Sequence, residues 1–139
     1  MKNKQHFTIS NQLLAYDLIR IYLGIGLVIK GIQFIFSPDT LLLLLKTSQV
    51  QIFSTFSLFY VPVAHIFGGA MLMLGFLTRL ASLIQIPILF GAVFFVNFNK
   101  NILIMQQNFE FSLLVLFLLL IYGIFGAGSL SVDYKLSND

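Results

Sequence analysis

Long apolar segments separated by short polar stretches constrain this chain more than any other feature of its sequence. They cover about residues 13–36, 56–77, 80–98 and 109–127. A helix of about 20 apolar residues crosses a bilayer core of about 30 Å. Only 9% of the 139 residues are charged, too few to cover a water-facing surface. The sequence therefore predicts an all-α membrane protein, with one domain over residues 1–139 and four transmembrane helices in a bundle.

One further, shorter helix is predicted between the first two apolar segments. Ser37, Pro38 and Asp39 form a helix-start pattern, with a capping residue, a proline at the first helical position and an acid in the first turn. The helix that starts there, about residues 38–50, soon becomes too polar to span a bilayer. We therefore expect it to be interfacial or re-entrant. In the third transmembrane helix, Pro87 predicts a kink.

The distribution of basic residues predicts the orientation in the membrane. An even number of transmembrane helices puts both termini on the same side. That side would carry more basic residues than the other: Lys2, Lys4, Arg79 and Lys135 against Lys46 and Lys100. Because cytoplasmic loops are enriched in Lys and Arg, both termini are expected in the cytoplasm, with the bundle in a bacterial inner membrane. The polar residues 1–12 precede an apolar segment that has no cleavage site of small residues, so we expect it to remain as the first helix.

Small and polar residues gather on one side of each of the first two predicted transmembrane helices. At about 100° per residue, one arc of about 60° on the first helix holds Asp17, Arg20, Gly24 and Gly31. On the second helix, an arc of about 80° includes His65 and Gly69. Small residues let helix backbones approach closely, and the second helix also carries the small-x-x-x-small pair Ala64 and Gly68. We therefore expect helix packing through Gly24, Gly31, Ala64, Gly68 and Gly69.

The ionisable residues of the predicted helices fall into two layers. The outer layer holds Lys30, His65 and Glu110, and the inner layer holds Asp17, Arg20 and Arg79, with Asp133 just beyond it. A charged or ionisable group inside a bilayer is costly, so it is expected to face protein or a ligand. The layers predict a site for a lipophilic molecule with a polar head, lined by His65, Glu110, Lys30, Arg20 and Asp17.

Each of these residues also has a purely structural interpretation. Asp17 and Arg20 can be an i,i+3 ion pair that holds helices together, and Lys30 can extend its ammonium group to the membrane surface. Arg79 is favoured as a topology anchor. A histidine in a helix core is often only hydrogen-bonded to a neighbouring helix, and an acid such as Glu110 is favourable at a helix N-terminus without any ligand.

Several classes of function find no support in the sequence. The chain has no cysteine, which excludes dithiol chemistry within it. A single intramembrane histidine cannot supply a bis-histidine haem site, and His65 with Glu110 provides too few ligands for a metal site, so neither haem nor metal is predicted. The net charge of +3 is scattered along the chain, so we expect contacts with membrane lipid and none with nucleic acid.

Several of these motifs together resemble the DoxX family. They are Arg20 with Gly24, the stretch from His65-x-x-Gly68-Gly69 to Leu74-Gly75-Phe76-Leu77-Thr78-Arg79, Phe109-Glu110-Phe111, and the segment 126–133. The resemblance implies a small four-helix membrane protein whose relatives include a subunit of a thiosulfate:quinone oxidoreductase. Members often have glutamate at the position of His65 and lysine at the position of Phe34. Lys30 offers a charge close to the latter position.

The resemblance and the polar layers lead to one main hypothesis and two alternatives. The main hypothesis is an accessory subunit of a quinone-linked redox system, with quinone as the bound cofactor. It would not be a complete enzyme alone, because no residue carries electrons, and a partner protein or a soluble donor would have to supply them. The alternatives are a transporter or channel for a small solute or protons, which would need a homo-oligomer, and a structural assembly factor for a membrane complex.

Overall fold

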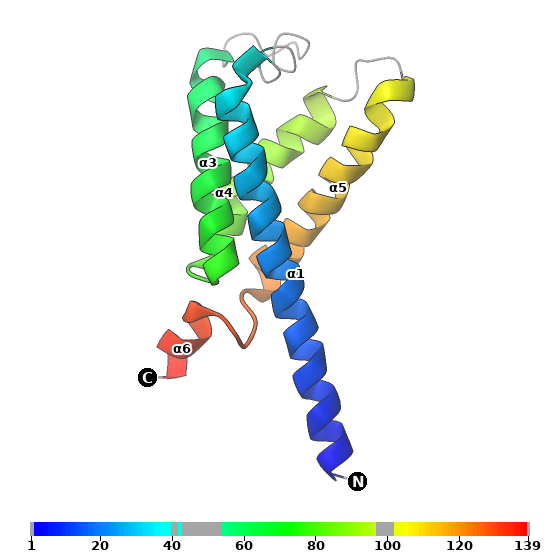
Figure 1. Ribbon diagram of the computed structural model, residues 1–139, viewed down its shortest axis with the longest axis vertical. Helices are drawn as coiled ribbons and strands as arrows, with labels where there is room; N and C mark the ends of the chain where they lie inside the picture. Colours follow the sequence, from blue (N-terminus) through cyan, green and yellow to red (C-terminus); the bar gives the residue numbers. More distant parts are fainter. Residues whose placement is uncertain (1, 40–41, 43–53, 97–101, 139) are drawn as a thin grey trace.

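The protein is all-helical throughout the part of the chain that the structure describes. This computed structural model describes residues 2–39, 42, 54–96 and 102–138 (Figure 1). The elements, in chain order, are α1 (Lys2–Phe36), α3 (Ser54–Leu74), α4 (Thr78–Gly91), a π-helix η2 (Ala92–Val96), α5 (Ile102–Phe125) and α6 (Val132–Asn138). The predicted all-α class is thus confirmed. Of the predicted short helix over 38–50, Pro38, Asp39 and Leu42 are helical, and the rest lies outside the described residues.

Helices α1 and α3 form one tightly packed pair, because glycines bring their backbones together. A Cβ atom added to Gly24 would lie 2.6 Å from the carbonyl oxygen of Gly69, and one added to Gly69 would lie 2.7 Å from that of Gly24. Further along the same interface, a Cβ on Gly31 would lie 2.9 Å from the carbonyl oxygen of Pro62. Larger residues at these positions would force the helices apart.

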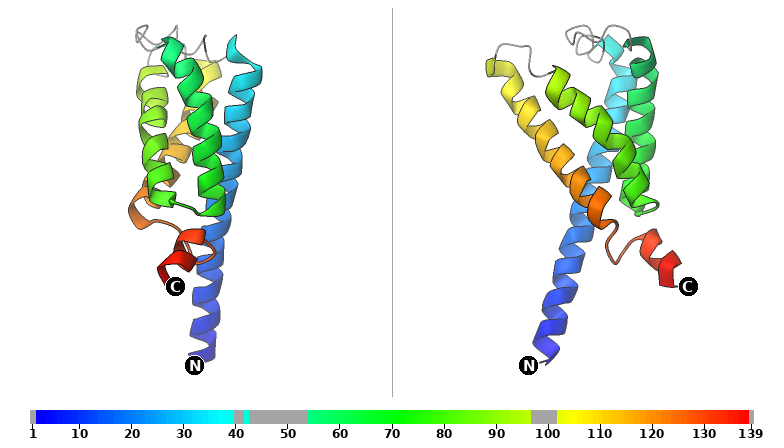
Figure 2. Two further views of the ribbon diagram at one scale, coloured as in Figure 1. Left: turned by 90° about the vertical axis from the view of Figure 1, so that its left-hand side faces the viewer. Right: turned by 180° about the vertical axis from the view of Figure 1, so that it is seen from behind.

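The second pair consists of α4 and α5, and α4 connects it to α3. The two pairs lie close together at the end of the bundle near α6 and diverge toward the opposite end (Figures 1 and 2). These two ends are called the α6 end and the opposite end below. Between the pairs lies an apolar core, which includes Leu23, Leu27, Leu72, Leu119 and Tyr122.

Three of the observed helix boundaries in the first two thirds of the chain differ from those predicted. Helix α1 begins at Lys2 and not near residue 13, because its first turns contain no glycine or proline that would interrupt a helix. Helix α3 ends at Leu74 and not at 77, because Gly75 turns the chain with a left-handed φ of 69°. Helix α4 then begins at Thr78, two residues before the predicted start.

The C-terminal third also differs from the prediction. Helix α5 begins at Ile102, seven residues before the predicted start, and it ends at Phe125, where Gly126 has a φ of 81°. Helix α4 continues through Pro87 and then changes to the π-helix η2. Beyond Gly126, a short non-helical segment leads into α6, which was not among the predicted helices.

Within the residues that the structure describes, two segments are long and apolar enough to cross a membrane by length and composition, namely Gln12–Phe36 of α1 and Phe56–Leu74 of α3. Two further apolar helical segments, Thr78–Phe94 and Phe109–Phe125, are shorter. Large apolar side chains such as Phe59, Phe67 and Phe125 are exposed on the outside of the bundle, as expected of a surface that faces lipid and not water.

Candidate functional site

Polar side chains are buried inside this apolar bundle, and they fall into three groups. One group surrounds the Asp17–Arg20 pair at the α6 end, a second lies at His65, and the third lies along α4. Among the described residues, the buried polar ones are Asp17, Arg20, His65, Thr78, Ser82, Gln85 and Ser131.

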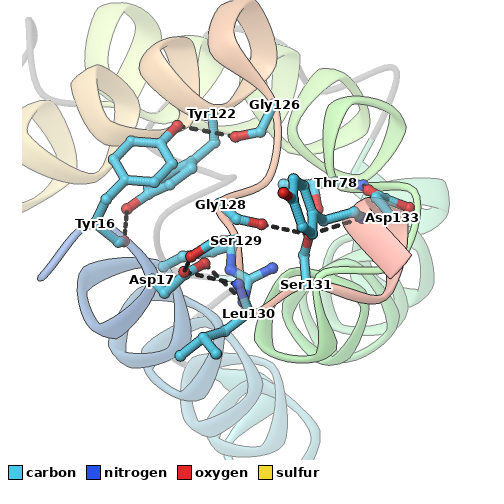
Figure 3. A network of polar contacts seen from close by, with 12 residues as sticks. Tyr16, Asp17, Thr78, Tyr122, Gly126, Gly128, Ser129, Leu130, Ser131 and Asp133 are labelled. Carbon is cyan, nitrogen blue, oxygen red and sulfur yellow. Dashed lines mark hydrogen bonds and ion pairs between the residues drawn. The ribbon is translucent and has the colours of Figure 1, made fainter. Parts of the chain in front are cut away.

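Asp17 and Arg20 form an ion pair that is shielded almost completely from solvent. Arg20 Nη2 lies 3.4 Å from Asp17 Oδ1, and the two side chains are 1% and 0% exposed. The second carboxylate oxygen, Oδ2, accepts hydrogen bonds from the Leu130 backbone N–H at 2.9 Å and from the Ser129 hydroxyl at 3.2 Å (Figure 3). The Asp17 carboxylate therefore joins α1 to the segment between α5 and α6.

Two glycines make room for this ion pair. A Cβ atom at Gly75 would collide with Arg20 Nη1, and a Cβ atom at Gly128 would collide with Asp17 Oδ1. Gly75 also has the positive φ that glycine adopts without strain. The Leu-Gly-Phe-Leu-Thr-Arg and Gly-Ala-Gly-Ser motifs of the sequence thus meet around the ion pair.

Two tyrosines connect α1 and α5 beside the ion pair. Their rings lie 4.7 Å apart between centroids. The Tyr16 hydroxyl donates to the Gly126 carbonyl at 2.9 Å, and the Tyr122 hydroxyl donates to the Tyr16 carbonyl at 2.8 Å (Figure 3). Both phenol groups therefore have structural partners.

Asp133 of α6 holds the first turn of α4. Its two carboxylate oxygens accept hydrogen bonds from the backbone N–H groups of Leu77, at 2.7 Å, and Thr78, at 2.9 Å. Its own N–H donates to the Gly75 carbonyl at 3.0 Å. An acidic group is favourable at a helix N-terminus, where backbone N–H groups lack partners within the helix. From the sequence, Asp133 was expected just beyond the inner layer, and its capping role was not predicted.

His65 is buried in the interior, at 4% exposure. Viewed down the axis of α3, at about 100° per residue, His65 lies between two glycines. Gly69, about 40° to one side, packs on α1, and Gly68, about 60° to the other side, packs on Gln85 of α4. The direction of His65 thus falls between the two neighbouring helices. The His65 ring lies 6.0 Å from the Phe34 ring, and the exposed Lys30 places its Nζ 5.6 Å from that same ring. The structure thus brings His65 and Lys30 to one region through Phe34.

Glu110 and Arg79, in contrast, lie on the outside of the bundle. Glu110 is exposed, and it is about 180° around α5 from the fully buried Leu119. Among the described residues, no hydrogen bond or ion pair links Glu110 to His65 or Lys30. Arg79 is exposed at the α6 end, where a Cβ on Gly126 would lie 3.1 Å from its Nε.

A row of buried polar residues on α4 was not predicted from the sequence. Thr78, Ser82 and Gln85 are all 0% exposed and lie within an arc of about 60°. Gln85 Nε2 donates to the Ala64 carbonyl at 2.7 Å. Within the described part of the chain, Thr78 Oγ1, Ser82 Oγ and Gln85 Oε1 have no hydrogen-bond partner. Their spacing of four and three residues in an apolar segment was the signal that could have identified them.

Among the described residues, the buried polar groups without hydrogen-bond partners include both donors and acceptors. Across the described ranges, no three side chains of His, Cys, Asp or Glu come close enough to hold a metal ion. Arg20 Nε and Nη1 have no hydrogen-bond partner there either, so the interior offers unpaired donors as well as acceptors. Such an interior can hydrogen-bond the head of a ligand whose remainder is apolar.

These features define the protein as an all-helical membrane protein with a polar interior. Comparison with family models then gives a match to the DoxX model over residues 15–98. That range covers more than half of the chain, and the chain belongs to the DoxX family. The match includes the α3–α4 turn and ends before α5. A search of curated proteins and a search of solved structures each found no match.

Proposed function

We propose that this DoxX-family protein crosses a bacterial inner membrane four times, through α1, α3, α4 with η2, and α5. Helix α4 and η2 together cover residues 78–96, and α5 has 24 residues. At about 1.5 Å per residue, each is close to the thickness of the hydrocarbon core. The two chain ends lie at the same end of the bundle (Figure 1), and the distribution of basic residues supports the proposal that this end is cytoplasmic.

Within this bundle, the proposed ligand is a lipophilic molecule with a polar head, of the quinone class. The observation that carries the proposal is the burial of His65, an ionisable side chain at 4% exposure whose direction falls between α1 and α4. An intramembrane ionisable residue is costly, so it favours a functional role. The Phe34 ring beside it offers an apolar contact for the ligand ring.

The residues present fit such a head. A neutral imidazole has one donor and one acceptor, and the buried polar row on α4 adds the unpaired Gln85 Oε1. His65 would hydrogen-bond an oxygen of the head, and Lys30 would approach it from the edge of the bundle. Glu110, which faces outward, is not part of the proposed site. A bound quinone would supply redox chemistry that no residue of this chain carries.

The protein would therefore act as an accessory subunit rather than as a complete enzyme. Electrons have to come from a partner protein or a soluble donor, because the chain has no cysteine. The segment 126–138, which is held at the α6 end by Asp17 and Gly75, lies where a cytoplasmic partner would reach the bundle.

Equilibrium binding of decylubiquinone to the purified protein in lipid nanodiscs tests the proposal. We expect His65→Ala to weaken binding by about tenfold or more, which corresponds to the loss of a hydrogen bond at a buried site. Phe67→Leu is the matched control, because Phe67 lies on the same helix and is 66% exposed. The proposal fails if wild type does not bind, or if both variants bind as wild type does.

The alternative of transport is separated from this proposal by a flux assay. Proteoliposomes that contain only this protein are expected to show no more proton leak than empty liposomes. A leak that depends on His65 in the absence of a redox partner would replace the proposed function by that of a channel or transporter.

A further inference from the structure

We propose that Gln85 makes the interior site selective for ligands whose polar head carries a hydroxyl group, so that a hydroquinone or phenol binds more tightly than a quinone. This inference rests on the function proposed above, and it names the chemical form of the ligand that the site prefers.

The first step is the fixed orientation of the Gln85 amide. Its Nε2 donates to the Ala64 carbonyl at 2.7 Å, and a Cβ on Gly68 would lie 2.5 Å from Nε2 and 3.2 Å from Cδ. The amide therefore packs directly on the α3 backbone. A flipped amide would place Oε1 against the Ala64 carbonyl, and two acceptors would face each other.

The second step is that the oxygen of the Gln85 amide, Oε1, lacks a hydrogen-bond donor within the described part of the chain. Oε1 is buried and has no hydrogen-bond partner among the described residues, and the whole side chain is 0% exposed. An amide oxygen can only accept, so only a donor can satisfy it. The Ser82 hydroxyl, one helical turn away, does not do so, since it is also unpaired. A buried acceptor without a donor costs about 1–3 kcal/mol.

The third step is the position of Gln85 relative to His65. The carbonyl that Gln85 contacts belongs to Ala64, the residue before His65, so Gln85 reaches α3 next to the position from which the His65 side chain extends. A ligand head at His65 would thus have the Gln85 amide as a neighbour. A hydroxyl on that head would donate to Oε1, whereas a carbonyl oxygen there would add a second acceptor.

Other polar groups nearby do not discriminate in this way. The hydroxyls of Ser82 and Thr78 can either donate or accept. Asp17 balances the charge of Arg20, and the unpaired N–H groups of Arg20 lie against Gly75, beyond the end of α3 and away from His65, so the buried charged groups do not decide the form of the head. The preference for a hydroxyl is therefore a property of Gln85.

The test compares decylubiquinol with decylubiquinone, which share one tail, in nanodiscs that contain the wild-type protein, Gln85→Met or Leu83→Met. We expect wild type to bind the quinol about tenfold more tightly. Gln85→Met, which keeps the length of the side chain but lacks the oxygen, should bring the ratio of affinities close to one. The exposed Leu83 on the same helix provides the control that should keep the wild-type ratio.

A redox titration gives a second measurement that does not depend on the folding of a variant. Tighter binding of the reduced form raises the midpoint potential of the bound couple, and a tenfold preference corresponds to about 30 mV for two electrons. If wild type binds quinol and quinone equally, or if Gln85→Met keeps the preference for the quinol, the role of Gln85 is overturned while the proposed function stands. If neither molecule binds, the proposed function fails together with this inference.

Discussion

The Asp17–Arg20 pair is the most demanding contact in the molecule, because both charges are buried in an apolar bundle. The pair depends on Gly75 and Gly128, which leave room for the guanidinium and the carboxylate, and on the backbone N–H of Leu130. A buried ion pair is tolerated when its members satisfy each other, and it becomes a large penalty when one member is lost.

We therefore expect Asp17→Leu to lower the free energy of unfolding by about 3–5 kcal/mol, since Arg20 would remain as an unpaired buried charge. The measurement is reversible unfolding in mixed detergent micelles. Adding Arg20→Met to the same chain removes the unpaired charge and should recover most of the loss. A single variant as stable as wild type would show that the pair does not contribute as the geometry indicates.

Among the elements, the interface between α1 and α3 depends on backbone contact at glycines. Gly24 and Gly69 face each other across it, whereas Gly26, two residues along α1, has nothing within 4 Å of its Cβ position. The two positions on α1 thus form a matched pair for substitution.

Gly24→Ala is expected to destabilise the protein by about 1–3 kcal/mol, because the added methyl group would overlap the α3 backbone. Gly26→Ala should be neutral or should stabilise the helix by up to about 1 kcal/mol, since alanine is the better helix former. Thermal unfolding of both variants in the same detergent measures the difference. Equal effects would contradict the observed interface.

A second prediction for the elements concerns the cap that α6 provides for α4. Asp133→Ala should cost about 1–2 kcal/mol and should speed amide hydrogen exchange at Leu77 and Thr78 specifically. Ser137→Ala, on the same helix, removes only a local hydrogen bond to the Tyr134 carbonyl and should leave that exchange unchanged. Unchanged exchange in Asp133→Ala would exclude the cap.

Helix faces could be predicted from the sequence more reliably than helix ends. Each predicted transmembrane helix contains few polar residues, and a rotation of about 100° per residue shows which of them share a face. Because a polar face should point away from lipid, Asp17, Arg20 and His65 were expected inside the bundle. The end of α3 depends on the left-handed turn at Gly75, and the start of α4 depends on Asp133, 55 residues away from Thr78. A cap at that distance in the sequence leaves no local signal.

The candidate site was predictable only in part for the same reason. His65 was identified as an isolated ionisable residue in an apolar segment. The orientation of the Gln85 amide is fixed by the Ala64 carbonyl on another helix, and the sequence near Gln85 does not reveal that contact. Glu110 was grouped with His65 only because both were expected at the same depth in the membrane, and depth does not determine on which side of α5 a residue lies.

For the whole molecule, the arrangement of the two helix pairs predicts a definite topology. Because the chain has no cysteine, single cysteines can be introduced as unique labels. Asp39→Cys and Ser137→Cys place them at exposed positions at opposite ends of the bundle. With four crossings, a membrane-impermeant maleimide should label the first in intact bacterial spheroplasts and the second only after permeabilisation. Labelling of both in intact cells would contradict this topology.

Photo-crosslinking of an azido-quinone to the protein in nanodiscs, followed by peptide mapping, tests the central proposal most directly. The proposed site predicts crosslinks within the interior-facing residues of α1, α3 and α4 around Phe34, His65 and Gln85, competed by excess decylubiquinol and reduced about tenfold or more by His65→Ala. Crosslinks confined to lipid-facing residues such as Phe59 and Phe67, with no effect of His65→Ala, would contradict a ligand site inside the bundle.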